Sequence, residues 1–178
     1  SNLSGQQGTF VGQNAGYSST ASYNTYMGSY AGQYHSTGEK NTSVGTYALK
    51  GVSATQTSAD NNVAVGMSAG ENIASGADNN TFVGMEAGKS NGAGDNNAYY
   101  GYSAGQNGTG SNNFFGGYYA GFSNIGNNSI QIGYRAGYKE KGSYKFYIAA
   151  DSTASAFGTR TDSKLLMYGD MSNADKAN

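Results

Sequence analysis

Residues 80–105 contain one nine-residue motif twice, as NTFVGMEAG at 80–88 and NAYYGYSAG at 97–105. The motif recurs along most of the chain, with a central glycine followed three residues later by alanine. The eight central glycines are Gly12, Gly28, Gly45, Gly66, Gly84, Gly101, Gly117 and Gly133. Seven steps of 16, 17, 21, 18, 17, 16 and 16 residues separate them. Such a short period predicts an array in which each unit buries its apolar face only against its neighbours.

Composition and spacing predict the fold class. The 178 residues include 29 glycines, 16 tyrosines and no proline, and several glycines in every window cost a helix about 1 kcal/mol each. We predict two very short strands per unit, one before the central glycine and one from it to the alanine. The expected fold is an all-β, parallel β-solenoid of about eight coils.

The chain divides near residue 137. Of the 21 charged residues, 11 lie from Tyr138 onward, and the runs YKFYIAA at 144–150 and KLLMYG at 164–169 lack the glycine motif. A solenoid needs an atypical, polar end unit to prevent end-to-end stacking. We therefore predict a repeat region at 1–137 and a C-terminal β cap at 138–178.

Alternation along a strand assigns side chains to two faces. We expect the residue before each central glycine and the alanine after it to point into a thin core. The opposite face is then aromatic, which is unusual for a solvated monomer. A second copy of the chain is the simplest cover, so we predict a homotrimer with interface residues Phe10, Tyr26, Phe82, Met85, Tyr99, Tyr102, Phe115, Tyr118 and Tyr134.

Asparagine stands four residues before the central glycine in six of eight units, at Asn24, Asn41, Asn62, Asn80, Asn97 and Asn113. Stacked asparagines can form a hydrogen-bonded ladder along the solenoid. Asparagine also tolerates the backbone of a tight corner, and the sequence favours neither explanation.

Charge and composition exclude several functions. A net charge of −1 argues against nucleic-acid binding, and the chain has no cysteine for disulfides or thiol chemistry. No apolar run is long enough to insert into a membrane. His35, the single histidine, is expected at the surface. Asp60, Asp78 and Asp95 occupy equivalent corners, where a weak cation site is a minor alternative. We expect no enzyme activity, no cofactor and no metal.

The repeat NxxxGxxAG resembles the head repeats of trimeric autotransporter adhesins, and more closely the Asn- and Gly-rich repeats of bacteriophage tail fibres and tail-fibre-like bacterial proteins. The runs at 144–152 and 165–171 look like the segment that precedes a self-cleaving chaperone domain in such fibres. The resemblance implies a left-handed roll of three chains that attaches to a cell surface, on a virion tail or outside the cell. Coils near 17 residues, and the lack of a coiled-coil stalk or anchor in this sequence, depart from the adhesin pattern.

The expected function is therefore a fibre segment that binds a cell-surface receptor, most simply a carbohydrate. The long step between Gly45 and Gly66 predicts a surface loop, and the candidate receptor contacts in that loop and the cap are Lys50, Thr55, Gln56, Thr57, Tyr138, Lys139 and Tyr144. Stacked Tyr102, Tyr118 and Tyr134 are an alternative sugar site. A monomeric ice-binding or carbohydrate-binding solenoid is the alternative function, although equivalent threonines occur only at Thr9, Thr25, Thr42 and Thr81.

Overall fold

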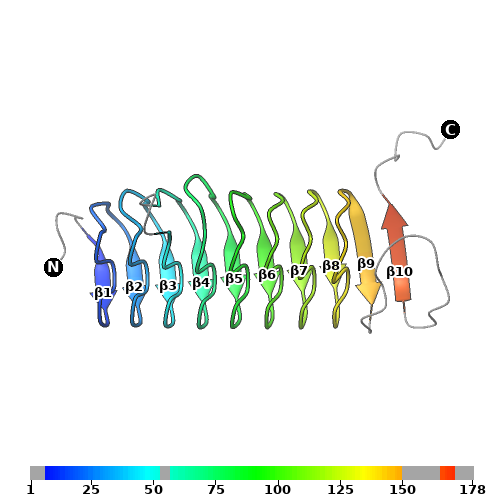
Figure 1. Cartoon of the computed structure of the whole chain (residues 1–178), viewed down its shortest axis with the longest axis horizontal. Helices are drawn as coiled ribbons and strands as arrows, with labels where there is room; N and C mark the ends of the chain where they lie inside the picture. The colour runs from blue at the N-terminus through cyan, green and yellow to red at the C-terminus, as the bar shows by residue number, and fades with distance from the viewer. Residues whose placement is uncertain (1–6, 53–56, 150–164, 171–178) are drawn as a thin grey trace.

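The chain forms a rod built around one β-sheet, as Figure 1 shows. The computed structural model describes residues 7–52, 57–149 and 165–170, and none of these residues is helical. Strands β1 to β9 pair in parallel in chain order, and β10 pairs antiparallel with β9. The predicted all-β, parallel solenoid of about eight coils is confirmed. The strands are β1 (Thr9–Val11), β2 (Thr25–Met27), β3 (Thr42–Val44), β4 (Val63–Val65), β5 (Thr81–Val83), β6 (Ala98–Tyr100), β7 (Phe114–Gly116), β8 (Ile130–Ile132), β9 (Lys145–Ala149) and β10 (Leu165–Asp170).

Each coil sits in register on the next, so equivalent residues stack. Thr9 pairs with Thr25, and Phe10 with Tyr26, one coil further on. We number positions in each coil from its central glycine, so that Phe10 is at −2 and Ala15 is at +3. Because neighbouring strands are about 4.8 Å apart, eight coils make a rod of about 40 Å.

The second predicted strand of each coil does not form. The residues after the central glycine turn instead, with the Ala31 N–H donating to the Gly28 carbonyl at 3.2 Å. Tyr30 at +2 and Gly32 at +4 have φ of 60° and 58°. This left-handed backbone is incompatible with an extended strand. The prediction was wrong because the alternating side chains of this segment resemble a strand, while its backbone is a series of tight turns.

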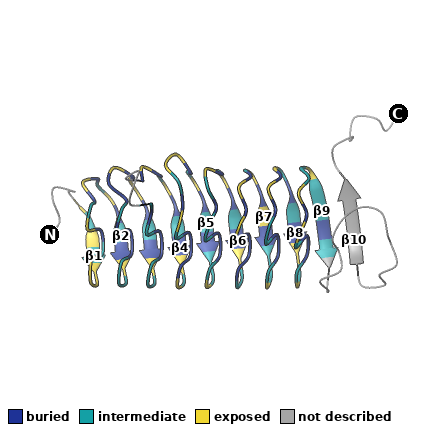
Figure 2. Ribbon diagram, viewed as in Figure 1, coloured by how far each residue is buried: buried dark blue, intermediate teal, exposed yellow. Residues whose placement is uncertain are grey.

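Aromatic rings at −2 fill the interior. Tyr26, Phe82, Tyr99 and Phe115 are fully buried, and the Tyr99 and Phe115 rings stack with centroids 4.7 Å apart. The alanines at +3 from Ala31 to Ala136 are also buried, as predicted. Figure 2 shows this buried line within the rod. The core is therefore a column of rings lined by alanine methyl groups.

The glycine at +4 makes room for the ring at −2. A Cβ added at Gly88 would lie 2.4 Å from the Phe82 ring. The third coil reverses the arrangement, since Leu49 stands at +4 and Ser43 at −2. Leu49 is fully buried in the same cluster as Ala64 of the fourth coil. Ser43 and Ala64 stand at −2 in the third and fourth coils in place of aromatic rings, and the Leu49 side chain fills the space that those rings would occupy.

The corner triplet Asp-Asn-Asn uses each residue differently. The Asp78 Oδ1 accepts the backbone N–H of Asp60 at 2.8 Å in the preceding coil. Asn79 is exposed and has φ of 59°, which asparagine tolerates better than most residues. Asn80 is fully buried. The tolerance of a tight corner therefore applies to Asn79 at −5 and not to Asn80 at −4, for which it was predicted.

The buried asparagines form a ladder along the rod. The Asn62 Oδ1 accepts the Asn80 backbone N–H at 2.8 Å, and its Nδ2 donates to the Ala77 carbonyl at 3.0 Å. The same pattern joins Asn24, Asn41, Asn62, Asn80, Asn97, Asn113 and Ser129. The ladder is side chain to backbone rather than amide to amide, so each asparagine satisfies the corner of its neighbour.

His35 lies inside the solenoid, which overturns its predicted place at the surface. The residue is fully buried, its backbone pairs with Thr57, and neither ring nitrogen has a hydrogen-bond partner. Position +7 faces inward in every coil but the third, where Val52 is half-exposed, and the buried Ile73 occupies it in the fourth coil. The prediction was wrong because His35 is polar and stands in a polar segment between two repeats. Its distance of seven residues from Gly28 is the feature that correlates with burial.

Burial lowers the pKa of His35 to about 4, because the charged imidazolium loses its hydration. The unfolded chain binds a proton below about pH 6.5 while the folded chain does not, so the free energy of unfolding falls as the pH decreases through this window. We expect a loss of about 2–3 kcal/mol between pH 7.5 and pH 4.5 from this residue. Urea unfolding of the native chain and His35→Leu at both pH values measures it. Equal pH dependence in the two proteins would contradict this account.

The sheet continues beyond the eighth coil. Phe146 and Tyr147 in β9 pair with Ile130 and Gln131 in β8. The Lys145 backbone N–H donates to the Ser129 Oγ at 3.1 Å, which takes the role of the ladder asparagine. Of the predicted cap at 138–178, the structure describes residues 138–149 and strand β10.

Candidate interface and binding surface

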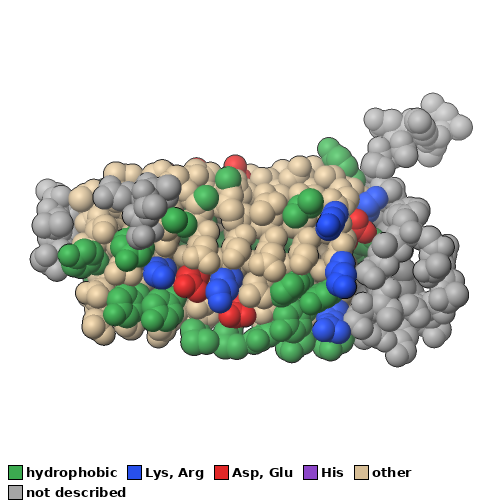
Figure 3. Space-filling view, in the orientation of Figure 1, with side chains coloured by type: hydrophobic (Ala, Val, Ile, Leu, Met, Phe, Trp, Pro, Cys, Tyr) green, Lys and Arg blue, Asp and Glu red, His purple; other side chains and the backbone are tan. Residues whose placement is uncertain are grey.

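A strip of uncharged residues runs along the rod. Positions −3 and −1 of each strand point away from the interior, and position +1 follows the central glycine. These three columns, which we call the uncharged strip, contain no Lys, Arg, Asp or Glu in any of the eight coils. They include exposed Val65, Met67 and Tyr100, and Met67 is 48 % exposed. In Figure 3, hydrophobic side chains gather along the lower edge of the rod, below a row of charged ones.

The strand faces are opposite to those predicted. Val11, Met27, Val44, Val65, Tyr100 and Ile132 at −1 are exposed, whereas the rings at −2 are inside. Strand alternation alone predicts aliphatic residues at −1 in the core and aromatic residues at −2 outside. The missed signal is the glycine at +4, which combines a positive φ with close approach of the side chain at −2 in most coils.

The predicted interface residues therefore separate into two groups. Tyr26, Phe82, Tyr99 and Phe115 are enclosed within their own chain and cannot meet a partner, and half-buried Phe10 stacks on Tyr26 with centroids 5.2 Å apart. Met85, Tyr118 and Tyr134 are exposed, and Tyr102 is half-exposed. The second group belongs to the uncharged strip at +1.

The tyrosines at +1 stack on one another along the rod. Ring centroids of Tyr102 and Tyr118 are 5.1 Å apart, and those of Tyr118 and Tyr134 are 5.4 Å apart with an interplanar angle of 5°. The ring faces are thus directed at neighbouring rings. A sugar packs best on an open ring face, so this column is better suited to packing against protein than to binding a sugar.

A second aromatic surface lies beside the strip in the last two coils. Arg135 at +2 is surrounded by the rings of Tyr138, Tyr119 and Tyr134, with its Cζ 4.9, 5.7 and 5.7 Å from their centroids. Phe122 stacks on Tyr138 with centroids 4.9 Å apart. We call these five residues the aromatic–arginine cluster. Two of the five residues are predicted from the sequence: Tyr138 as a receptor contact, and Tyr134 as an interface residue or part of an alternative sugar site. The available signal for the others is the repeat of large side chains at +2 and +5 in consecutive coils.

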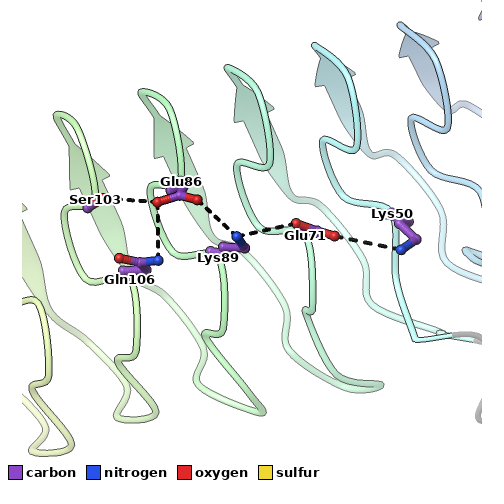
Figure 4. A network of polar contacts seen from close by, with 6 residues as sticks. All are labelled: Lys50, Glu71, Glu86, Lys89, Ser103 and Gln106. Carbon is purple, nitrogen blue, oxygen red and sulfur yellow. Dashed lines mark hydrogen bonds and ion pairs between the residues drawn. The ribbon is translucent and has the colours of Figure 1, made fainter.

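Charged side chains in the middle of the rod pair with one another. Lys50 lies 3.6 Å from Glu71, Lys89 lies 3.8 Å from Glu71, and Lys89 lies 2.9 Å from Glu86. Gln106 and Ser103 donate to Glu86 at 3.2 and 3.4 Å, as Figure 4 shows. The hydrogen bond to Glu86 raises the pKa of Lys89. These pairs join successive coils and leave little unbalanced charge there.

The predicted receptor contacts have different surroundings. Thr57 is fully buried and its Oγ1 accepts the Val52 N–H at 3.0 Å, so it cannot touch a receptor. Thr55 and Gln56 lie outside the described residues. Lys50 is half-exposed and lies over the Tyr47 ring at 5.3 Å. Lys139 and Tyr144 are exposed, and Tyr138 is half-buried in the aromatic–arginine cluster.

The aspartates at the corners have a structural role. An Oδ1 atom of Asp60, Asp78 and Asp95 accepts the backbone N–H of Glu39, Asp60 and Asp78 respectively. Within the described part of the chain, no three His, Asp or Glu side chains lie close enough to hold a metal ion. The same residues include no helix long and apolar enough to span a membrane.

The threonines of the alternative ice-binding hypothesis lie at −3, on the outer face of β1, β2, β3 and β5. Val63, Ala98, Phe114 and Ile130 occupy that position in the other coils. Comparison of the chain with protein-family models, with curated proteins and with solved structures finds no match in any of the three.

Proposed function

We propose that the chain is a segment of a homotrimeric fibre, non-enzymatic and placed outside the cell or on a virion tail, which attaches to a cell surface. The observation that carries the proposal is the uncharged strip. It runs through all eight coils, while every charged side chain of those coils lies elsewhere. A long strip of exposed Val, Met, Ile and Tyr on a soluble rod indicates an interface.

A second and third copy of the same chain are the occupants that fit this strip best. Three positions in each of eight coils amount to 24 residues, and stable interfaces typically use about 20–30 residues on each side. Copies related by a rotation axis parallel to the rod would bring equal coils together at equal heights. Large residues such as Tyr118 and Tyr134 would then meet at one end and smaller ones such as Ser29 and Thr46 at the other.

The attachment role follows from the form of the rod and from the repeat resemblance. A stiff three-chain rod holds its loops and end away from its point of anchorage, and three copies of a weak site multiply affinity through avidity. The resemblance to tail fibres and adhesin heads supports a left-handed roll, a C-terminal cap and a carbohydrate receptor. In this proposal, Lys139 and Tyr144 are better candidates for receptor contact than Lys50, because both are exposed and Lys50 is only half-exposed.

A charge placed in the strip tests the proposal. We expect Met85→Glu to disrupt assembly, because three carboxylates would be buried close together around one axis. Light scattering should give the mass of a smaller species, and attachment of labelled protein to bacterial cells should fall at least tenfold as avidity is lost. The matched control is Asn72→Glu, which adds the same charge at an exposed position outside the strip.

Circular dichroism separates assembly from folding, since the coil interior does not include Met85. A folded Met85→Glu protein with the native mass would show that the strip is not the interface. If Met85→Glu loses the trimer mass but attaches to cells as well as the native protein, the strip is the interface but avidity does not contribute to attachment.

A further inference from the structure

Arg135 has a positive charge that no described side chain balances. The ion pairs between described residues are those of Lys50, Lys89, Glu71 and Glu86, far along the rod from the last coil. The Nε atom of Arg135 is buried without a hydrogen-bond partner, while the residue as a whole is half-exposed. Its side chain contacts the rings of Tyr119, Tyr134 and Tyr138. The guanidinium group is held in place but retains hydrogen-bond donors for another molecule.

The described surface around this arginine is positive. Lys139, in the same turn as Arg135, and Lys141, two residues further on, are exposed. Glu140, the one carboxylate among them, is buried and accepts hydrogen bonds from the Lys141 and Gly142 backbone N–H groups and from the Tyr147 hydroxyl. Its charge is therefore directed inward. A chain with a net charge of −1 thus has a local excess of positive charge beside its aromatic–arginine cluster.

A similar ring and cation occur at the other end of the rod without this excess. Tyr30 and Tyr47 stack with centroids 5.3 Å apart, and the Lys50 Nζ lies 5.3 Å from the Tyr47 centroid. There the ammonium group is paired with Glu71 at 3.6 Å. The two clusters have the same chemistry of rings, but only the one at Arg135 has an unpaired cation.

We propose that the aromatic–arginine cluster binds an acidic polysaccharide. The outer edge of the Arg135 guanidinium would donate paired hydrogen bonds to a carboxylate, sulfate or phosphate group, for which its planar fork is suited. Phe122 stacks on Tyr138 and would keep that ring beside the guanidinium group, and Lys139 would add long-range attraction. The proposal rests on the attachment role but does not need the trimer, since all five residues belong to one chain.

Matched pairs of polymers test the charge requirement. Binding of the full chain to polygalacturonate is compared with its fully methyl-esterified form, and binding to dextran sulfate with dextran, by biolayer interferometry at low and physiological salt. We expect at least one acidic polymer to bind at least tenfold more tightly than its neutral partner. Binding should weaken as salt is raised.

Three variants test the site. Arg135→Gln should reduce acidic-polymer binding at least tenfold, and Lys139→Gln, which is exposed and does not pack in the cluster, should reduce it two- to fivefold. Lys50→Gln is the matched control and should stay within twofold of the native chain. Thermal unfolding of each protein shows whether loss of binding reflects loss of structure. If Arg135→Gln is unfolded, binding of the acidic polymer by Lys139→Gln decides the test.

The proposal is overturned if neither acidic polymer binds, if the neutral partners bind equally well, or if Lys139→Gln and a folded Arg135→Gln bind like the native chain. These results are distinct from those for the fibre. A native trimer that attaches to cells but ignores both acidic polymers would reject this site alone. A monomer that binds them through Arg135 would reject the trimer alone.

Discussion

Replacing Gly117 by alanine is expected to lower the free energy of unfolding by about 3–5 kcal/mol, the sum of backbone strain and overpacking. Gly117 has φ of 137°, a conformation that side chains with a Cβ rarely adopt. A Cβ there would lie 2.5 Å from the carbonyl oxygen of Gly133 in the next coil. Neither backbone can move without separating two coils that are hydrogen-bonded along their length. Urea unfolding measures the loss.

Gly116 is the control for Gly117, because the two glycines are adjacent and differ only in geometry. Gly116 is the last residue of β7 and its φ is not positive. An added Cβ would point outward and meet only the Phe114 ring at 3.5 Å. We expect Gly116→Ala to leave stability unchanged or raise it by up to about 1 kcal/mol. Similar losses for both variants would show that stacking of the central glycines is not what limits the coil spacing.

Replacing Asn62 by alanine is expected to cost about 2–5 kcal/mol, because it leaves two buried backbone groups without partners at about 1–3 kcal/mol each. These are the Asn80 N–H and the Ala77 carbonyl, which Asn62 bonds at 2.8 and 3.0 Å. Both losses lie in the middle of the rod, where water cannot replace the side chain without opening the corner. Hydrogen exchange should show faster exchange in a peptide that contains residue 80.

Asn72→Ala is the control for the ladder. Asn72 lies in the same coil as Asn62, ten residues further along the chain, and is exposed. We expect its stability to stay within about 0.5 kcal/mol of the native chain, as for other surface substitutions. If the two asparagine variants were equally stable, the ladder would contribute nothing beyond the strand pairing itself.

Much of the fold could be predicted from the repeat. The spacing of Gly84, Gly101 and Gly117 gives the coil length, the residues before each glycine form the strands, and Asn80 and its equivalents form the ladder. These features are local, since each depends on the residue types within one coil. The turn after the central glycine could not be recognised in the same way, because residues such as Tyr30 and Glu86 adopt left-handed backbone conformations that their type does not favour.

The side of the strand that faces inward depends on packing between positions distant within the coil. Phe82 is inside because Gly88 leaves space above it, and His35 is inside because position +7 returns to the core. The general rule that aliphatic residues are buried first failed here, since a thin solenoid can stack flat rings more easily than branched chains. For this reason the sequence identified Met85, Tyr118 and Tyr134 as outward-facing residues but missed Val65 and Ile132 in the same strip.

The C-terminal surface was predicted only in part. Tyr138, Lys139 and Tyr144 were recognised as candidates because the charge pattern changes there. Arg135 was not, because within the repeat it occupies the position of Ser103 and Tyr119, and its surroundings depend on rings from two coils. Side-chain contacts between coils become visible only when the register is known.

The molar mass of the native chain in solution distinguishes a trimer from a monomer. One chain has a mass of 18.4 kDa, and we expect a single species near three times that value by light scattering after size exclusion, unchanged on tenfold dilution. A stable species of 18.4 kDa would contradict it. The uncharged strip would then be exposed on a monomer, and binding of a ligand or of ice on that face would replace assembly as its function.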